Sequence, residues 1–134
     1  VKTIGDAIMA VFPRSLPALR AILNAQDELA KPATGHIPLF LKAGLHHGPC
    51  IAVTLNDRLD YFGSTVNLAA RLERYSSGED VIISDSVLND PEVGLLLSHP
   101  GNSLKAEPFE AHLKGFDEQQ FPLWRVRRHN ARKP

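Results

Sequence analysis

The central part of the sequence reads Leu59-Asp60-Tyr61-Phe62-Gly63-Ser64-Thr65-Val66-Asn67-Leu68-Ala69-Ala70-Arg71-Leu72-Glu73. Its first four residues are mostly apolar and typical of a short strand, which Gly63 ends. Ser64 or Thr65 can then cap a helix, which we expect to run to about Tyr75. The segment therefore predicts a strand that leads directly into a helix.

The segments on either side continue this alternation of strands and helices. We expect strands at 3–4, 8–12, 39–43, 50–55, 59–62, 80–83, 111–113 and 122–126. Tight turns are predicted at Gly5-Asp6 and at 56–58, and two further helices at about 15–30 and 85–97. Residues 98–108 read as a polar loop, and the basic tail from about 127 to 134 as frayed. This order predicts an α/β or α+β sandwich.

The composition indicates one globular domain over residues 1–134. Its net charge does not favour binding to nucleic acid or to an anionic membrane. Lys plus Arg and Asp plus Glu number 15 each, and 43% of the residues are hydrophobic. Cys50 is the single cysteine, so an internal disulfide and a cysteine zinc site are excluded. No apolar run approaches the roughly 18 residues of a membrane span. We expect a cytoplasmic segment, and the missing initiator Met suggests a piece of a longer protein.

Four motifs in this order resemble the class III adenylate and guanylate cyclase catalytic domain. They lie at residues 2–12, 42–49, 59–73 and 113–116. The resemblance implies an α+β, ferredoxin-like nucleotidyl cyclase fold, in which helices pack on a mostly antiparallel sheet. It also implies that the first strand and early helices of that fold, with a second metal-binding aspartate, would lie upstream of Lys2.

The resemblance implies that Asp6 is a ligand of two divalent metal ions, Mg²⁺ or Mn²⁺. Carboxylate oxygens are the ligands that such hard cations prefer, and Gly5 would expose Asp6 at a turn. The simpler interpretation is that Asp6 is a favourable turn residue.

Asn67 and Arg71 are the catalytic residues that the resemblance implies. Residues four apart lie on one face of a helix, where an amide could hold the ribose oxygen and a guanidinium the charge on phosphorus. A solvated helix face is the alternative, but positions 67, 68, 74 and 75 offer Arg71 no acidic partner.

Four further residues match substrate-binding positions of the family. Lys2 and Asp60 resemble the adenylate type, since a lysine can donate to adenine N1 and an aspartate can accept from its N6 amino group. Lys42 and Lys114 match phosphate-contacting positions, although arginine is more usual at the first of them. The alternatives are a strand-end ion pair for the first two and solvated lysines for the others.

These residues together predict an adenylate cyclase module that forms 3′,5′-cyclic AMP from ATP at the interface of a homodimer, or of a heterodimer with another cyclase domain. The rival hypotheses are a non-catalytic nucleotide-binding or dimerisation module and a guanylate cyclase. The adjacent His46 and His47 would face opposite sides of a strand, so we interpret them as structural. We expect no partner of the nucleic-acid class and no membrane contact by this segment.

Overall fold

The computed structural model describes residues 2–4, 7–31, 39–55, 58–112 and 120–128. A four-stranded sheet forms its centre, in the order β3 (Ala43–Leu45), β6 (Asp80–Ser84), β8 (Gln120–Arg128) and β7 (Leu104–His112). β3 runs parallel to β6, while β6 and β7 each run antiparallel to β8. The prediction of an α+β fold with a mostly antiparallel sheet is confirmed.

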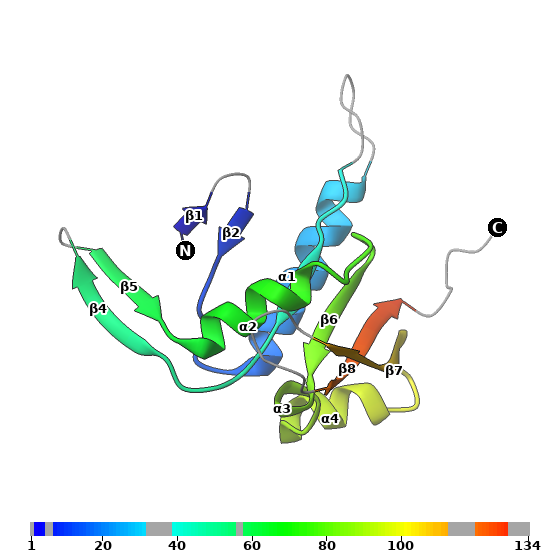
Figure 1. Cartoon of the computed structure of the whole chain (residues 1–134). Helices are drawn as coiled ribbons and strands as arrows, with labels where there is room; N and C mark the ends of the chain where they lie inside the picture. The colour runs from blue at the N-terminus through cyan, green and yellow to red at the C-terminus, as the bar shows by residue number, and fades with distance from the viewer. Residues whose placement is uncertain (1, 5–6, 32–38, 56–57, 113–119, 129–134) are drawn as a thin grey trace.

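Helices cover both faces of this sheet, as Figure 1 shows. Successive residues of a strand point to opposite faces, which separates Val81 and Ile83 from Ile82 in the fully buried β6. Val81 and Ile83 pack with apolar residues of α1 (Ser15–Ala30), α3 (Asp85–Leu88) and α4 (Pro91–Ser98). Ile82 packs with Leu68 and Leu72 of α2 (Ser64–Glu73) on the other face. The helix α2 is therefore fixed to the sheet by an apolar core of its own.

Two hairpins form separate two-stranded sheets. β1 (Lys2–Ile4) pairs with β2 (Ala7–Met9), and β4 (Ile51–Leu55) pairs with β5 (Arg58–Phe62). In each hairpin the last paired residues are separated by two residues of sequence, since Ile4 pairs with Ala7 and Leu55 with Arg58. Both predicted turns are therefore confirmed as hairpin connections, except that Arg58 already belongs to β5. Residues 5–6 and 56–57 themselves lie outside the described part.

The predicted helix over 85–97 is wrong, because the chain forms two helices there. α3 ends at Leu88, and α4 begins at Pro91. Proline supplies no N–H and disfavours a helical conformation in the residue before it, so Pro91 suits a helix start. The Asp90 carboxylate accepts from the N–H groups of Glu92 and Val93, both at 3.1 Å, and caps the new helix.

The expected loop over 98–108 is also wrong, because β7 begins at Leu104. Pro108 argues against a central strand, but β7 lies at the edge of the sheet, where a missing N–H is tolerated. β8 extends to Arg128, so Arg127 and Arg128 belong to a strand and not to a frayed tail. Arg127 pairs with Glu107, and Arg128 with Asp27 of α1.

The remaining differences concern strand ends. β2 ends at Met9 and not at Phe12, and β3 covers 43–45 in place of 39–43. The Leu41 carbonyl accepts from the side-chain amide of Gln26 at 2.8 Å, and the pairing of β3 with β6 starts only at Ala43. Among the described residues, no helix is long and apolar enough to cross a membrane.

Candidate functional site

Asp60 lies on β5 just before the start of α2. It pairs with Val53 of β4, so the two side chains share one face of the hairpin with Phe62. Val53 and Phe62 are 36% and 42% exposed, and Asp60 is half-buried. The N–H of Tyr61 donates to Asp60 Oδ1 at 2.8 Å. Asp60 thus presents a carboxylate on a partly exposed apolar face.

Gly63 makes the sharp change of direction from β5 into α2. Its φ of 132° lies in a region that L side chains rarely adopt, so glycine is required there. Gly63 is also the residue that precedes the helix, and no side chain caps α2. The prediction that Ser64 or Thr65 caps this helix is therefore wrong, since both lie inside it.

The helix α2 carries its buried apolar residues and its polar residues on different sides. Leu68 and Leu72 are buried against the sheet, whereas Asn67 is exposed and Arg71 is half-buried. Asn67 and Arg71 stand one turn apart, so they share a face that is offset from the buried one. An amide and a guanidinium in this arrangement can contact neighbouring oxygens of one polyanionic ligand.

Gly44 lets α2 approach the sheet closely. A methyl group at this position would lie 2.5 Å from the backbone nitrogen of Glu73 and 2.8 Å from the carbonyl oxygen of Ala69. The backbone of the helix therefore rests directly on β3. A glycine within an apolar strand is a signal of close backbone approach, so the sequence holds a sign of this contact.

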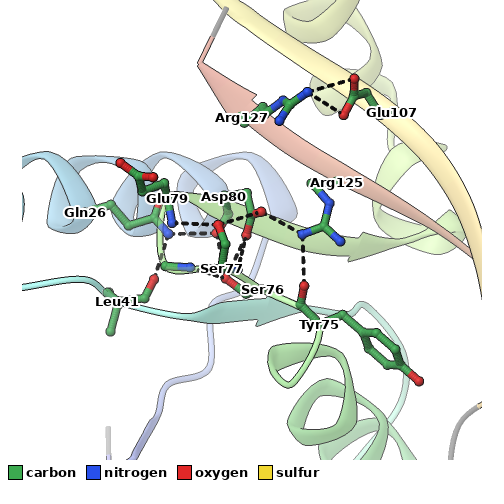
Figure 2. A network of polar contacts seen from close by, with 11 residues as sticks. Gln26, Leu41, Tyr75, Ser76, Ser77, Glu79, Asp80, Glu107, Arg125 and Arg127 are labelled. Atoms are coloured by element: carbon green, nitrogen blue, oxygen red, sulfur yellow. Dashed lines mark hydrogen bonds and ion pairs between the residues drawn. The ribbon is translucent and has the colours of Figure 1, made fainter. Parts of the chain in front are cut away.

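A buried polar network holds the chain just after α2, as Figure 2 shows. The Asp80 carboxylate accepts from Ser76 Oγ at 2.8 Å, from the N–H of Ser77 at 2.8 Å and from Arg125 Nη1 at 2.7 Å. Arg125 Nη1 also donates to the Tyr75 carbonyl at 2.9 Å, and its guanidinium lies 5.2 Å from the centre of the Phe109 ring. Asp80 of β6 and Arg125 of β8 thus hold the turn that follows α2 in place by hydrogen bonds.

The charge of Asp80 is stabilised in spite of its burial. Burial alone would raise the pKa of this carboxyl group. The hydrogen bonds from Arg125, from the Ser77 backbone and from the side chains of Ser76 and Ser77 outweigh burial and lower the pKa. The network is therefore a structural anchor that depends on an ionised aspartate.

The structure describes only some of the other predicted site residues. Lys42 is exposed immediately before β3, and Lys2 belongs to β1. Asp6 and Lys114 lie outside the described residues. Within the described ranges, no three His, Cys, Asp or Glu residues gather as a metal site would require. The structure thus brings Asp60, Asn67 and Arg71 onto one strand–helix unit, and their predicted roles remain predictions.

The chain is similar in sequence to a known family of catalytic domains and to individual members of it. A family model described as the adenylate and guanylate cyclase catalytic domain matches residues 1–115. Human guanylate cyclase soluble subunit beta-2 is 35% identical over 98 residues, which cover 63% of this chain and 16% of that protein. The germination-specific adenylate cyclase of Dictyostelium discoideum is 30% identical over 101 residues, which cover 65% and 12%. The chain therefore spans less than a fifth of these curated relatives.

A solved structure agrees with the fold. The chain resembles the crystal structure of the guanylate cyclase domain of RhGC from Catenaria anguillulae in complex with GTP, with a TM-score of 0.68 and 26% identity. The likeness covers 96% of this chain and 71% of that one. It supports the cyclase-type fold that the four sequence motifs predict.

Proposed function

This chain belongs to the adenylate and guanylate cyclase catalytic domain family, and on that premise we propose that it converts ATP into 3′,5′-cyclic AMP and pyrophosphate within a dimer. In this reaction the ribose 3′ oxygen forms a bond to the α-phosphorus, while the bond from that phosphorus to the bridging oxygen of the β-phosphate breaks. Pyrophosphate leaves with that oxygen. Negative charge accumulates on the phosphate oxygens along the way.

The observation that carries the proposal is the shared face of Asn67 and Arg71 on α2. The buried Leu68 and Leu72 hold the helix against the sheet, so the polar face is presented by a rigid element. The Asn67 amide can orient the ribose, and the Arg71 guanidinium can stabilise the charge that develops on phosphorus. Both functions need a fixed geometry more than they need proton transfer.

The preference for ATP rests on Asp60 and Lys2. A half-buried carboxylate on a partly apolar face suits an adenine base, whose N6 amino group is a donor. Guanine presents an oxygen there, which a carboxylate would repel. Since one of the two relatives above is a guanylate cyclase and the other an adenylate cyclase, base preference is a property to be measured.

Asp6 is the residue of this chain that we propose as a metal ligand, by the chemistry of its carboxylate. When bound, Mg²⁺ or Mn²⁺ ions would neutralise the triphosphate and favour ionisation of the 3′ hydroxyl group. Lys42 and Lys114 would add positive charge near the phosphates. Asn67 and Arg71 would act on the reacting centre itself.

The test is a turnover assay on the full-length protein with Mg²⁺ or Mn²⁺, in which ATP and GTP compete. Asn67→Ala should lower kcat by about 10²-fold, because the ribose 3′ oxygen would lose the amide that orients it toward the α-phosphorus. Asp6→Ala should abolish metal-dependent turnover. Asn24→Ala, at an exposed asparagine of α1, is the matched control and should leave turnover unchanged.

Unchanged turnover in both Asn67→Ala and Asp6→Ala would overturn the proposal. A wild-type protein that binds the nucleotide without forming a cyclic product would instead favour the non-catalytic module. Faster turnover of GTP than of ATP would assign the chain to guanylate cyclases.

A further inference from the structure

The segment from His46 to Cys50, which joins β3 to β4, contacts the N-terminal turn of α2. Thr65 Oγ1 donates a hydrogen bond to the carbonyl oxygen of Pro49. A methyl group on Gly48 would lie 2.7 Å from Thr65 Oγ1 and 3.4 Å from His46 Nε2. Thr65, Gly48 and His46 therefore lie together at the start of the helix, and only a glycine leaves room between them.

A chain of hydrogen bonds fixes the other end of this segment to β6 and α3. His46 Nδ1 lies 2.7 Å from Ser84 Oγ, and Ser84 Oγ lies 2.9 Å from Ser86 Oγ. Ser86 Oγ donates to the carbonyl oxygen of His47 at 2.8 Å. β3 and β6 are parallel, so His46 and Ser84 meet where both strands end.

The number of available protons decides which group donates in each of these hydrogen bonds. Ser86 has a single hydroxyl proton, and the His47 carbonyl can only accept, so that proton points to His47. Ser84 must then donate to Ser86, which leaves its oxygen as the acceptor of a proton from His46 Nδ1. The ring therefore carries a proton on Nδ1.

A neutral ring is what the surroundings favour. Burial lowers the pKa of His46, the neighbouring His47 acts in the same direction, and the Asp85 carboxylate opposes them. Among the described residues, His46 makes its hydrogen bonds through Nδ1 alone. The histidine thus acts as a donor that ties its backbone to the end of β6.

We propose that Thr65 and His46 are positioning residues, which fasten the N-terminal turn of α2 to the carboxyl-terminal ends of β3 and β6 and so orient Asn67 and Arg71 for the proposed reaction. The inference rests on the proposed function. Thr65 lies on the buried side of α2 with Leu68 and Leu72, at spacings of three and seven residues, and away from Asn67. It acts through the helix and not by contact with the substrate.

The reason for such a fastening is the way α2 begins. Gly63 caps it without a side chain, so the first turn lacks the usual local anchor. Asn67 lies in the second turn, and its N–H reaches back to the Gly63 carbonyl at 3.2 Å. A displacement of about 1 Å at a reacting centre can cost roughly 10²-fold in rate, so a loose first turn would affect Asn67 directly.

The test uses Thr65→Val, which keeps the shape and removes the donor, and Thr65→Ser, which keeps the donor. In Thr65→Val, hydrogen exchange at the amides of residues 67–69 should become roughly five- to tenfold faster. In the full-length protein, kcat should fall about tenfold while KM for ATP stays within about twofold. Thr65→Ser should restore both, and Thr54→Val, at an exposed threonine of β4, is the matched control.

The His46 end of the fastening has a separate spectroscopic signature. Nitrogen NMR should show a protonated Nδ1 and an unprotonated Nε2 in the wild-type ring, and Ser84→Ala should remove that preference. Ser98→Ala, at the exposed end of α4, should not. A His46 ring protonated on Nε2 in the wild type would overturn the assigned directions of these hydrogen bonds.

Each remaining outcome is decisive. Unchanged exchange in Thr65→Val would refute the fastening, and faster exchange with an unchanged kcat would refute the positioning role. If the wild-type protein forms no cyclic nucleotide, the proposed function fails, and with it the role in catalysis. The exchange and NMR measurements would still decide whether the fastening exists.

Discussion

At the scale of single residues, Asp80 shows the condition under which a buried charge stabilises this fold. Its side chain is 4% exposed, and both carboxylate oxygens have two donors within 3.0 Å. A buried carboxylate with such a complete set of donors is favourable only while it is ionised. The donors come from the turn after α2 and from β8, so the charge links distant parts of the chain.

We expect Asp80→Asn to destabilise the chain by about 2–4 kcal/mol at pH 7, because it leaves Arg125 without its anionic partner. The folded-state pKa of Asp80 lies below its unfolded value of about 3.9. The stabilisation is therefore complete well above pH 4 and is lost as the pH falls through the folded-state pKa. Urea unfolding of both proteins from pH 7 to pH 3 measures it.

The difference in unfolding free energy between wild type and Asp80→Asn should narrow as the pH falls below about 4. A difference that stays constant would contradict the assignment to this charge. Glu107→Gln is the control, since its carboxylate pairs with Arg127 at the surface. The midpoint of that variant should match the wild type at pH 7.

At the scale of elements, the position of α2 depends on Gly44. We expect Gly44→Ala to cost about 1–3 kcal/mol, because the new methyl group would overlap the backbone at Ala69 and Glu73 and push the helix from the sheet. The change should also lower cyclase turnover, since Asn67 and Arg71 move with the helix. Urea unfolding and the turnover assay are the two measurements.

Gly94→Ala provides the matched control for this substitution. Gly94 lies within α4, and the nearest atom to an added methyl group is the Leu88 carbonyl oxygen at 3.8 Å. Alanine is favoured over glycine in a helix by about 1 kcal/mol, so this variant should be as stable as the wild type or more so. Equal stability of Gly44→Ala and Gly94→Ala would show that α2 does not need the close approach.

The elements also show what the sequence could predict. The strand, Gly63 and helix of residues 59–73 follow from local apolar periodicity and turn chemistry, and the shared face of Asn67 and Arg71 follows with them. Local patterns could not reveal that Pro108 lies on an edge strand, since that depends on which strands neighbour β7. The fastening by Thr65 joins residues 16 apart, and the Asp80–Arg125 pair residues 45 apart. Such contacts follow from the fold and not from sequence spacing.

At the scale of the whole molecule, the two hairpins form sheets separate from the main sheet (Figure 1). They carry exposed apolar side chains. Ile8 of β2 is 68% exposed, and Phe62 of β5 is 42% exposed. A two-stranded sheet is marginal in water on its own, so we expect these surfaces to be covered by association with a second cyclase domain. That expectation agrees with a site completed by two chains.

Association should make thermal unfolding depend on concentration, because mass action stabilises the associated state. We expect the midpoint of this chain to rise over a hundredfold range of concentration, and sedimentation to report a species larger than the monomer. Ile8→Ser should weaken both effects by removing apolar area from the hairpin. Leu95→Ser is the control, since Leu95 is 72% exposed on α4, far from the hairpins in Figure 1.

A sharp transition of a monomer, at one midpoint for all concentrations, would show that the hairpins need no partner in solution. The dimeric site would then have to assemble only when the nucleotide binds.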